Sequence, residues 1–244
     1  MLLAIDIGNT NINVGVFQGR RLLRKYSVPT ASKSYSVSFK SILEGRQEFE
    51  AIICSVVPVA TRALQSDLRK LGIKPYIIGK DIKVPVRNLY RKPWQVGQDR
   101  LVNAYAAVSL YGAPIVAIDF GTAITFDIIS AKRDYLGGMI LPGLGISLNA
   151  LAKRTALLPE VRLRQPKEFI GKDTQNSILS GVIFGFASLT GEFSRRLKRK
   201  LGSKTKVIAT GGNARFMAKY CRCFDRVDPE LTLKGLMLLY LETR

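Results

Sequence analysis

The sequence predicts an α/β protein made of two similar halves. Residues 4–10 (AIDIGNT) align with residues 117–123 (AIDFGTA) at a constant offset of 113 residues. In both copies an apolar run reaches an aspartate, turns through a glycine and re-enters an extended run. After the first turn, apolar residues alternate with polar or small ones, which is typical of the second strand of a hairpin. We therefore expect two related domains, at residues 1–112 and 113–244.

The rest of the first half predicts a β-α-β unit and a closing helix. Residues 51–55 and 75–78 are short apolar runs typical of strands. Between them Pro58 is a favourable first residue for a helix. The apolar residues of that helix fall on one face, at Ala60, Leu64, Leu68 and Leu71. A later helix is expected to begin near Asp99 and to end at Gly112.

The second half predicts one long helix and a short C-terminal helix. Apolar residues recur at helical spacing from Ile178 to Leu197, and Leu179, Ile183 and Phe184 add apolar side chains on the other faces. We expect this helix to be buried on all sides, in part by a second subunit. Residues 207–209 predict a strand, and residues 231–241 a final helix.

Composition limits the possible chemistry. The chain has no histidine, which excludes histidine-based nucleophilic catalysis and histidine-ligated metals. Its net charge of +20 favours anionic partners such as nucleotides, phosphorylated metabolites or nucleic acid. Many of the charges are also explained as solvated helix ends, and no aromatic residues interleave the basic runs as a base-stacking surface requires. Nucleic-acid binding is therefore not favoured.

The sequence also favours the cytoplasm. No basic region precedes the short N-terminal apolar run, which Asp6 interrupts, so a signal peptide is not predicted. We expect no bilayer-spanning segment and no membrane association. The three cysteines, Cys54, Cys221 and Cys223, form no zinc-binding pattern and suit a reducing compartment.

The two Asp-x-Gly hairpins (the Asp-Gly hairpins), Asp6-Ile7-Gly8 and Asp119-Phe120-Gly121, predict a cleft that holds polyphosphate. Glycine amides and small polar side chains there surround phosphate oxygens without side-chain bulk. Asp6 and Asp119 are positioned to hold cations, and magnesium is required to neutralise a triphosphate during transfer. A plainer explanation is that each Asp-Gly only makes a turn. Two matching copies in one chain favour the functional interpretation.

Asp99 is the candidate general base. A histidine-free protein needs a carboxylate to accept the proton of an attacking hydroxyl. At the start of a helix the macrodipole favours the ionised form of Asp99. Arg100 is a candidate two-pronged donor to a substrate carboxylate. The alternatives are an ordinary N-terminal helix aspartate and a surface arginine.

Two glycine-rich segments are weaker candidates. The turn Thr210-Gly211-Gly212-Asn213 lets an adenine or ribose approach bare backbone, although such turns are as often only tight connections. Gly137-Gly138 and Pro142-Gly143 bracket a short strand that is expected to shape the wall of the cleft without taking part in chemistry.

Together these segments resemble the type III pantothenate kinases, a family of the actin-like ATPase and sugar kinase superfamily. The resemblance spans nearly the whole chain, through AIDIGNTN, NLYRKPWQVGQDR, AIDFGTAITFD, GGMILPGLGIS, IGKDTQNSILSG, ATGGNA and DPELTLKGL. It implies two ribonuclease-H-like domains with a cleft between them. It also implies ATP-dependent phosphorylation of pantothenate to 4'-phosphopantothenate, the first step of coenzyme A biosynthesis, by in-line transfer.

The resemblance also implies roles for individual residues. Asp99 is the proton acceptor, Asp119 the ligand of a monovalent cation (potassium or ammonium), and Asp6 a magnesium ligand, directly or through water. Pantothenate contacts are implied for Tyr90, Gly97, Gln98, Asp99, Arg100 and Thr174. ATP contacts are implied for Asp6, Ile7, Gly8, Asn9, Thr10, Asn11, Ile12, Asn13, Gly121, Thr122, Gly211 and Gly212. The family further implies a homodimer with the substrate pocket at or near the subunit boundary.

Two other functions are compatible with the sequence. One is a nucleic-acid-binding or transcriptional accessory protein on an inactive kinase-like scaffold. The other is a phosphatase or ATPase of the same superfamily with a different substrate. The intact aspartates of both hairpins and of the GQDR segment argue against the first, and the GQDR and Tyr90 region favours pantothenate over the second.

Overall fold

The computed structural model describes residues 1–32, 35–43 and 48–243, and it divides into two compact units. Unit 1 comprises residues 1–110 and 230–244, and unit 2 comprises residues 111–229. The first boundary lies close to the predicted division at residue 112. The second does not match the prediction, because the C-terminal helix belongs to unit 1 and not to the second half.

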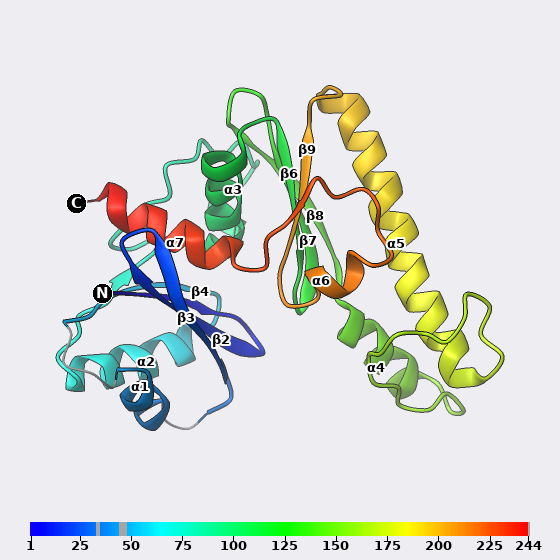
Figure 1. Cartoon of the computed structure of the whole chain (residues 1–244), viewed down its shortest axis with the longest axis horizontal. Helices are drawn as coiled ribbons and strands as arrows, with labels where there is room; N and C mark the ends of the chain where they lie inside the picture. The colour runs from blue at the N-terminus through cyan, green and yellow to red at the C-terminus, as the bar shows by residue number, and fades with distance from the viewer. Residues whose placement is uncertain (33–34, 44–47, 244) are drawn as a thin grey trace. The chain divides into compact units, whose positions relative to one another are not determined.

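Unit 1 is built on a five-stranded mixed sheet (Figure 1). Its strands are β1 (Leu2–Ile7), β2 (Asn11–Gln18), β3 (Arg21–Pro29), β4 (Glu50–Ser55) and β5 (Tyr76–Ile77), in the order β3-β2-β1-β4-β5. The first three strands form an antiparallel meander, while β4 and β5 run parallel to β1. The predicted hairpin and β-α-β unit are both present.

Alternate side chains of β1 point to opposite faces of this sheet, and each face has its own helices. Leu3, Ile5 and Ile7 pack with α1 (Ser36–Ile42) and α2 (Pro58–Lys70). Leu2 and Ala4 pack with α3 (Gln98–Tyr111) and α7 (Leu231–Glu242). A short 3-10 helix, η1 (Pro93–Gln95), precedes α3. By the same alternation Asp6 lies on the face that carries α3.

Unit 2 repeats the sheet of unit 1. Its strands are β6 (Ile115–Phe120), β7 (Ala123–Ile129), β8 (Tyr135–Pro142), β9 (Lys206–Thr210) and β10 (Arg226–Val227), in the order β10-β9-β6-β7-β8. β6 therefore corresponds to β1, and β9 to β4. The structure shows that the sequence repeat is a duplication of one sheet topology.

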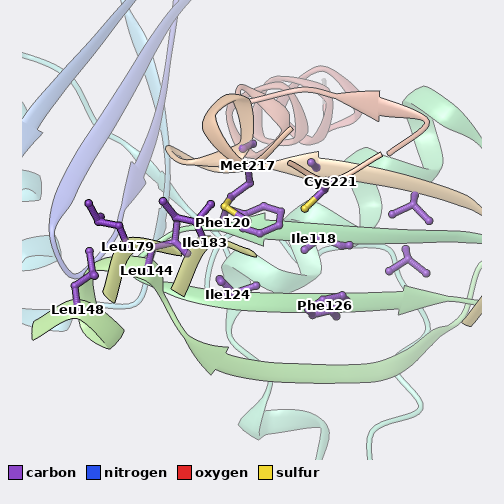
Figure 2. Packing of buried hydrophobic residues seen from close by; sticks show 14 of the residues in the cluster. Ile118, Phe120, Ile124, Phe126, Leu144, Leu148, Leu179, Ile183, Met217 and Cys221 are labelled. Carbon is purple, nitrogen blue, oxygen red and sulfur yellow. The ribbon is translucent and has the colours of Figure 1, made fainter. Parts of the chain in front are cut away.

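The core of unit 2 lies between its sheet and its helices. Strand residues such as Phe120 and Phe126 pack with residues from α4 (Leu144–Arg154), α5 (Thr174–Leu201) and α6 (Ala214–Met217). Figure 2 shows the strand side chains beside Leu144, Leu179, Ile183 and Met217. The predicted long helix is α5, and only part of its surface is covered within this unit.

The assignment of α7 to unit 1 has a clear packing reason. Almost every residue from Leu231 to Tyr240 is buried, and the helix lies over β1, β4 and β2. A Cβ atom on Gly235 would lie 2.8 Å from Cγ1 of Val102 and 2.9 Å from Cβ of Ala106, both on α3. Only glycine allows this close approach of the two helices. The apolar pattern predicted the helix but not the sheet that it covers.

Candidate active site

The first Asp-Gly turn lies at the carboxyl end of β1. Asp6 is paired in register with Asn13 of β2 and with Cys54 of β4. The turn closes with a hydrogen bond from Gly8 N to Asn11 O of 3.0 Å. A Cβ atom on Gly8 would lie 3.2 Å from that same carbonyl oxygen, so the turn offers bare backbone at this point. The residues predicted for the first phosphate loop, 6–13, run from the end of β1 through this turn into β2.

Asp99 lies close to the same end of the sheet. Burial raises the pKa of the Cys54 thiol, and the negative charges of Asp6 and Asp99 raise it further. Both carboxylates therefore act on one buried thiol, and unit 1 brings the predicted base toward the predicted phosphate loop.

The expectation that the helix terminus favours an ionised Asp99 is corrected by its surroundings. Burial is the largest effect and raises the pKa of Asp99 above its ordinary value. The Arg100 amide, which donates to Asp99 Oδ1 at 2.9 Å, and the Arg100 charge oppose this rise without cancelling it. Desolvation outweighs the helix terminus because the carboxylate is only partly exposed. A carboxylate with a raised pKa is a better proton acceptor.

The residues beside Asp99 are held tightly. A Cβ atom on Gly97 would collide with Asp99 Oδ1, and one on Gly79 would lie 2.9 Å from Cδ of Gln98. Gly97 therefore leaves room for the catalytic candidate itself. Arg100 is only 7% exposed, so the alternative of a surface arginine is wrong.

Two further predicted substrate residues come from other segments of the chain. Tyr90 is half-buried in the loop before η1, where its backbone N–H donates to Asn88 Oδ1 at 3.0 Å. Thr174 is the first residue of α5 in unit 2, next to the N-cap Asp173, and it is exposed. The other predicted pantothenate residues all belong to unit 1.

The second Asp-Gly turn lies at the carboxyl end of β6. Asp119 is paired in register with Thr210 of β9, so the turn after β9 lies beside it. A Cβ atom on Gly211 would collide with Asp119 Oδ1, and one on Gly121 would lie 3.2 Å from the same atom. Gly211 also has a positive φ of 88°. Gly121 and Gly211, two predicted ATP contacts, therefore both lie against the carboxylate of Asp119, the predicted cation ligand.

Gly143 has a part in this second turn that the sequence did not reveal. Its N–H donates to Thr122 O at 3.1 Å, and a Cβ atom there would collide with that oxygen and lie 2.7 Å from Gly121 O. Asn213 N likewise donates to Phe120 O at 3.0 Å. Gly143 was expected only to shape the wall of the cleft. The repeat offset was the available signal, because it aligns Gly143 with the residue that follows β3.

The donor set around Asp119 fits a cation bound together with phosphate. The Thr210 hydroxyl is 1% exposed and, among the described residues, has no hydrogen-bond partner. Such a buried oxygen beside a carboxylate suits an oxygen-seeking cation. No three His, Cys, Asp or Glu side chains gather as a metal site within the described part of the chain. Magnesium held with nucleotide phosphates needs only one or two carboxylates, so the residues present also fit that ion.

Helix α5 meets the length and hydropathy criteria for a membrane span, contrary to the expectation that no segment would. It has 28 residues, and 28% of its most apolar window is buried within the chain. The remaining apolar surface includes a groove of about 490 Å³ lined by Leu151, Ile178, Val182, Phe186 and Leu189 together with small residues. The expected burial on all sides is therefore not achieved within one chain.

Two matching sheets, each with an Asp-Gly turn at the carboxyl end of its first strand, define the actin-like ATPase class of α/β proteins. A Campylobacter jejuni protein described as a Baf family transcriptional activator superposes with a TM-score of 0.63 at 21% identity, covering 99% of this chain and 98% of that one. The activator of 2-hydroxyisocaproyl-CoA dehydratase from Clostridium difficile, solved with bound ADPNP, superposes with a TM-score of 0.50 at 11% identity, covering 99% and 94%. At these identities the similarity shows the fold alone.

The chain belongs to the type III pantothenate kinase family. The model of that family matches residues 2–196. Among relatives named type III pantothenate kinase, the protein from Moorella thermoacetica is 40% identical over 250 residues, covering 98% of both chains. The relative from Myxococcus xanthus is 38% identical over 254 residues with the same coverage.

Proposed function

We propose that the protein transfers the γ-phosphate of ATP to pantothenate, giving 4'-phosphopantothenate and ADP. This is the first step of coenzyme A biosynthesis. The observation that carries the proposal is similarity to type III pantothenate kinases over 98% of the chain. The intact GQDR segment supports it, because Asp99 and Asp6 both act electrostatically on the buried Cys54 thiol. We place this reaction in the cytoplasm.

Asp99 acts as the general base in this proposal. The primary hydroxyl of pantothenate attacks the γ-phosphorus, and its oxygen forms a new P–O bond. The bond from the γ-phosphorus to the bridging oxygen breaks, and ADP leaves with that electron pair. Asp99 accepts the hydroxyl proton. The raised pKa of Asp99 supports this role, because it narrows the difference between the pKa of the base and the pKa of the attacking hydroxyl.

The remaining site residues bind and orient the two substrates. The first hairpin and Gly121, Thr122, Gly211 and Gly212 surround ATP, mainly through backbone amides. Asp6 holds magnesium, directly or through water, and Asp119 holds potassium or ammonium with the Thr210 hydroxyl beside it. These cations, when bound, offset the negative charge of the phosphates. Tyr90, Gly97, Gln98, Arg100 and Thr174 bind pantothenate, with Arg100 directed to its carboxylate.

The protein acts as a homodimer through α5. Ser177, Gly181 and Gly185 recur every four residues and therefore share one face of this helix. Cβ atoms on Gly181 and Gly185 would meet no described atom within 4 Å, so a second helix has room to approach closely. The apolar groove beside them gives that helix an apolar surface to cover. Ile178, Leu179 and Ile183 are packed into the core of unit 2, which favours a protein partner over lipid.

A coupled assay of ADP release with and without pantothenate tests the proposed activity. We expect release that depends on pantothenate and a product whose mass exceeds that of pantothenate by one phosphoryl group. Asp99→Asn serves as the matched control, because it keeps the size of the side chain and removes the base. Equal ADP release in the presence and absence of pantothenate, with no phosphorylated product, would refute the proposal.

A further inference from the structure

Thr30, the residue that follows β3, holds the first Asp-Gly turn at two points. Its side-chain Oγ1 donates to Gly8 O at 2.7 Å, and its backbone N–H donates to Thr10 O at 3.0 Å. Thr30 is 8% exposed, so both hydrogen bonds are largely shielded from water. One residue outside the hairpin therefore fixes the carbonyl groups on both sides of Asn9.

Thr30 is itself held from behind. The Tyr35 hydroxyl donates to Thr30 O at 2.6 Å, and the Tyr35 backbone N–H donates to Asp67 Oδ2 of α2 at 3.1 Å. Tyr35 is 1% exposed and belongs to the core between the sheet and α1 and α2. A continuous series of hydrogen bonds thus connects the turn to a helix on the other face of the sheet from α3.

Unit 2 shows which part of this arrangement is particular to the first turn. Gly143 lies 113 residues after Thr30, at the offset that relates Asp6 to Asp119, and it follows β8 as Thr30 follows β3. Its N–H donates to the carbonyl of Thr122, the residue before β7, as the Thr30 N–H donates to the carbonyl of Thr10, the residue before β2. A Cβ atom at Gly143 would collide with the turn, so no side chain can reach it there. The duplicated fold keeps the backbone hydrogen bond in both turns, and the first turn adds a hydroxyl.

The added hydrogen bond sets the direction of a backbone amide. A peptide group is planar, and its C=O and N–H point in opposite directions. Thr30 holds the carbonyl of Gly8, so the N–H of Asn9 in the same peptide group is directed away from Thr30. Thr30 also holds the carbonyl of Thr10, so the N–H of Asn11 is directed away from it in the same manner. In the proposed function these amides face ATP phosphates. Fixing them before ATP binds removes an ordering cost from binding.

We propose that Thr30 is a positioning residue for phosphate binding, acting through Gly8 and Thr10 and supported by Tyr35. This inference rests on the proposed function, because it takes the first turn to be a phosphate site. It predicts that the Thr30 hydroxyl matters for ligands that carry the β- and γ-phosphates and not for adenosine.

Calorimetric titration of the full-length protein with Mg-ATP and with adenosine tests the inference. For Thr30→Val we expect about tenfold weaker Mg-ATP binding, the effect of one lost hydrogen bond, with adenosine binding unchanged. Thr30→Ser, which keeps the hydroxyl, should restore Mg-ATP binding. Tyr35→Phe should weaken it in the same direction and by less.

Thr205→Val is the matched control. The Thr205 hydroxyl also donates to a loop carbonyl, Gly202 O at 2.6 Å, and it is 2% exposed, but it lies before β9 at the opposite end of the sheet from the turns. Equal Mg-ATP affinity in Thr30→Val and the wild type overturns the inference. So does a loss of Mg-ATP and adenosine binding alike that Thr30→Ser does not restore, or an equal loss in Thr205→Val.

The design separates this inference from the proposed function. A wild-type protein that binds Mg-ATP without phosphorylating pantothenate overturns the proposed substrate, and the Thr30 comparison still decides the role of Thr30. A wild-type protein that does not bind Mg-ATP overturns both.

Discussion

Gly211 lies directly against the carboxylate of Asp119. A Cβ atom at this position would collide with Asp119 Oδ1 and would lie 2.9 Å from the backbone of Phe120. The φ angle of 88° adds a second reason for glycine. Because residue 211 has no side chain, the Asp119 carboxylate, which is proposed to hold a cation, can lie directly against this turn.

Gly211→Ala should destabilise the protein and displace Asp119. We expect a loss of about 2 kcal/mol in the free energy of unfolding, from strain and overpacking together. Thermal unfolding measures it. Gly212→Ala is the neighbouring control, because a Cβ atom there would meet no described atom within 4 Å. Equal stability of the two variants would contradict the close contact.

Asp99→Asn should reduce turnover by at least about 10²-fold, the usual contribution of a general base.

The same substitution, Asp99→Asn, should also stabilise the fold at neutral pH. Burial raises the pKa of Asp99, so the folded state favours the protonated carboxyl, and ionisation above that pKa costs stability. Asparagine removes this cost and keeps an oxygen for the Arg100 amide. Unfolding midpoints at pH 7 measure the gain, which should vanish at a pH low enough to protonate Asp99 in both states. An unchanged or lower midpoint at pH 7 contradicts the burial of a charge.

The raised pKa of Asp99 should also appear in the pH dependence of kcat/KM. Asp99 must be deprotonated to accept a proton, so activity falls as the pH decreases through its pKa. Because that pKa is raised, the acid limb should lie above the range of an ordinary aspartate. Initial rates measured across the acid range locate it. A limb at or below the ordinary aspartate range would remove Asp99 from the role of base.

Activity should depend on a monovalent cation. Replacing potassium or ammonium with sodium at constant ionic strength should lower the rate, because the Asp119 carboxylate and the buried Thr210 hydroxyl are proposed to hold potassium or ammonium. Asp119→Asn should abolish the difference between the salts and raise the KM for ATP. A rate equal in sodium and potassium buffers counts against this site.

Gly185→Leu should convert the homodimer to a monomer. The position is open within one chain, so the fold should tolerate leucine, while the added bulk blocks a second helix. Gly191→Leu is the control, since its position is also open and lies on another face of α5. Light scattering should give a mass near twice 27.0 kDa for the wild type and the control. A monomeric wild type, or recovery of the wild type only with membranes, contradicts the proposed interface.

The repeat made most of the fold predictable from the sequence. Aligning Asp6 with Asp119 predicted two similar halves, each with a hairpin, and helical spacing predicted α2, α3, α5 and α7. The sequence did not predict the unit to which α7 belongs, because an all-apolar helix specifies burial and not a partner. It also gave no sign of α1, α4 or α6, whose short segments have weak periodicity.

The residue types identified a candidate site, but the sequence did not show the burial that controls its energetics. Asp99 was identified from the need for a base, but the sign of its pKa shift depends on burial, which sequence does not show. The buried state of Arg100 was missed for the same reason. Thr30 was missed because a threonine after a strand is unremarkable until the repeat offset pairs it with Gly143.

The return of α7 to unit 1 sets an order for folding during synthesis. Unit 2 is continuous in sequence, so all its residues leave the ribosome before the last helix does. The part of the first sheet that packs against α7 stays uncovered until that helix has been synthesised, so the amino-terminal unit is completed after unit 2. Truncation into α7 would therefore remove packing from the unit that contains Asp99.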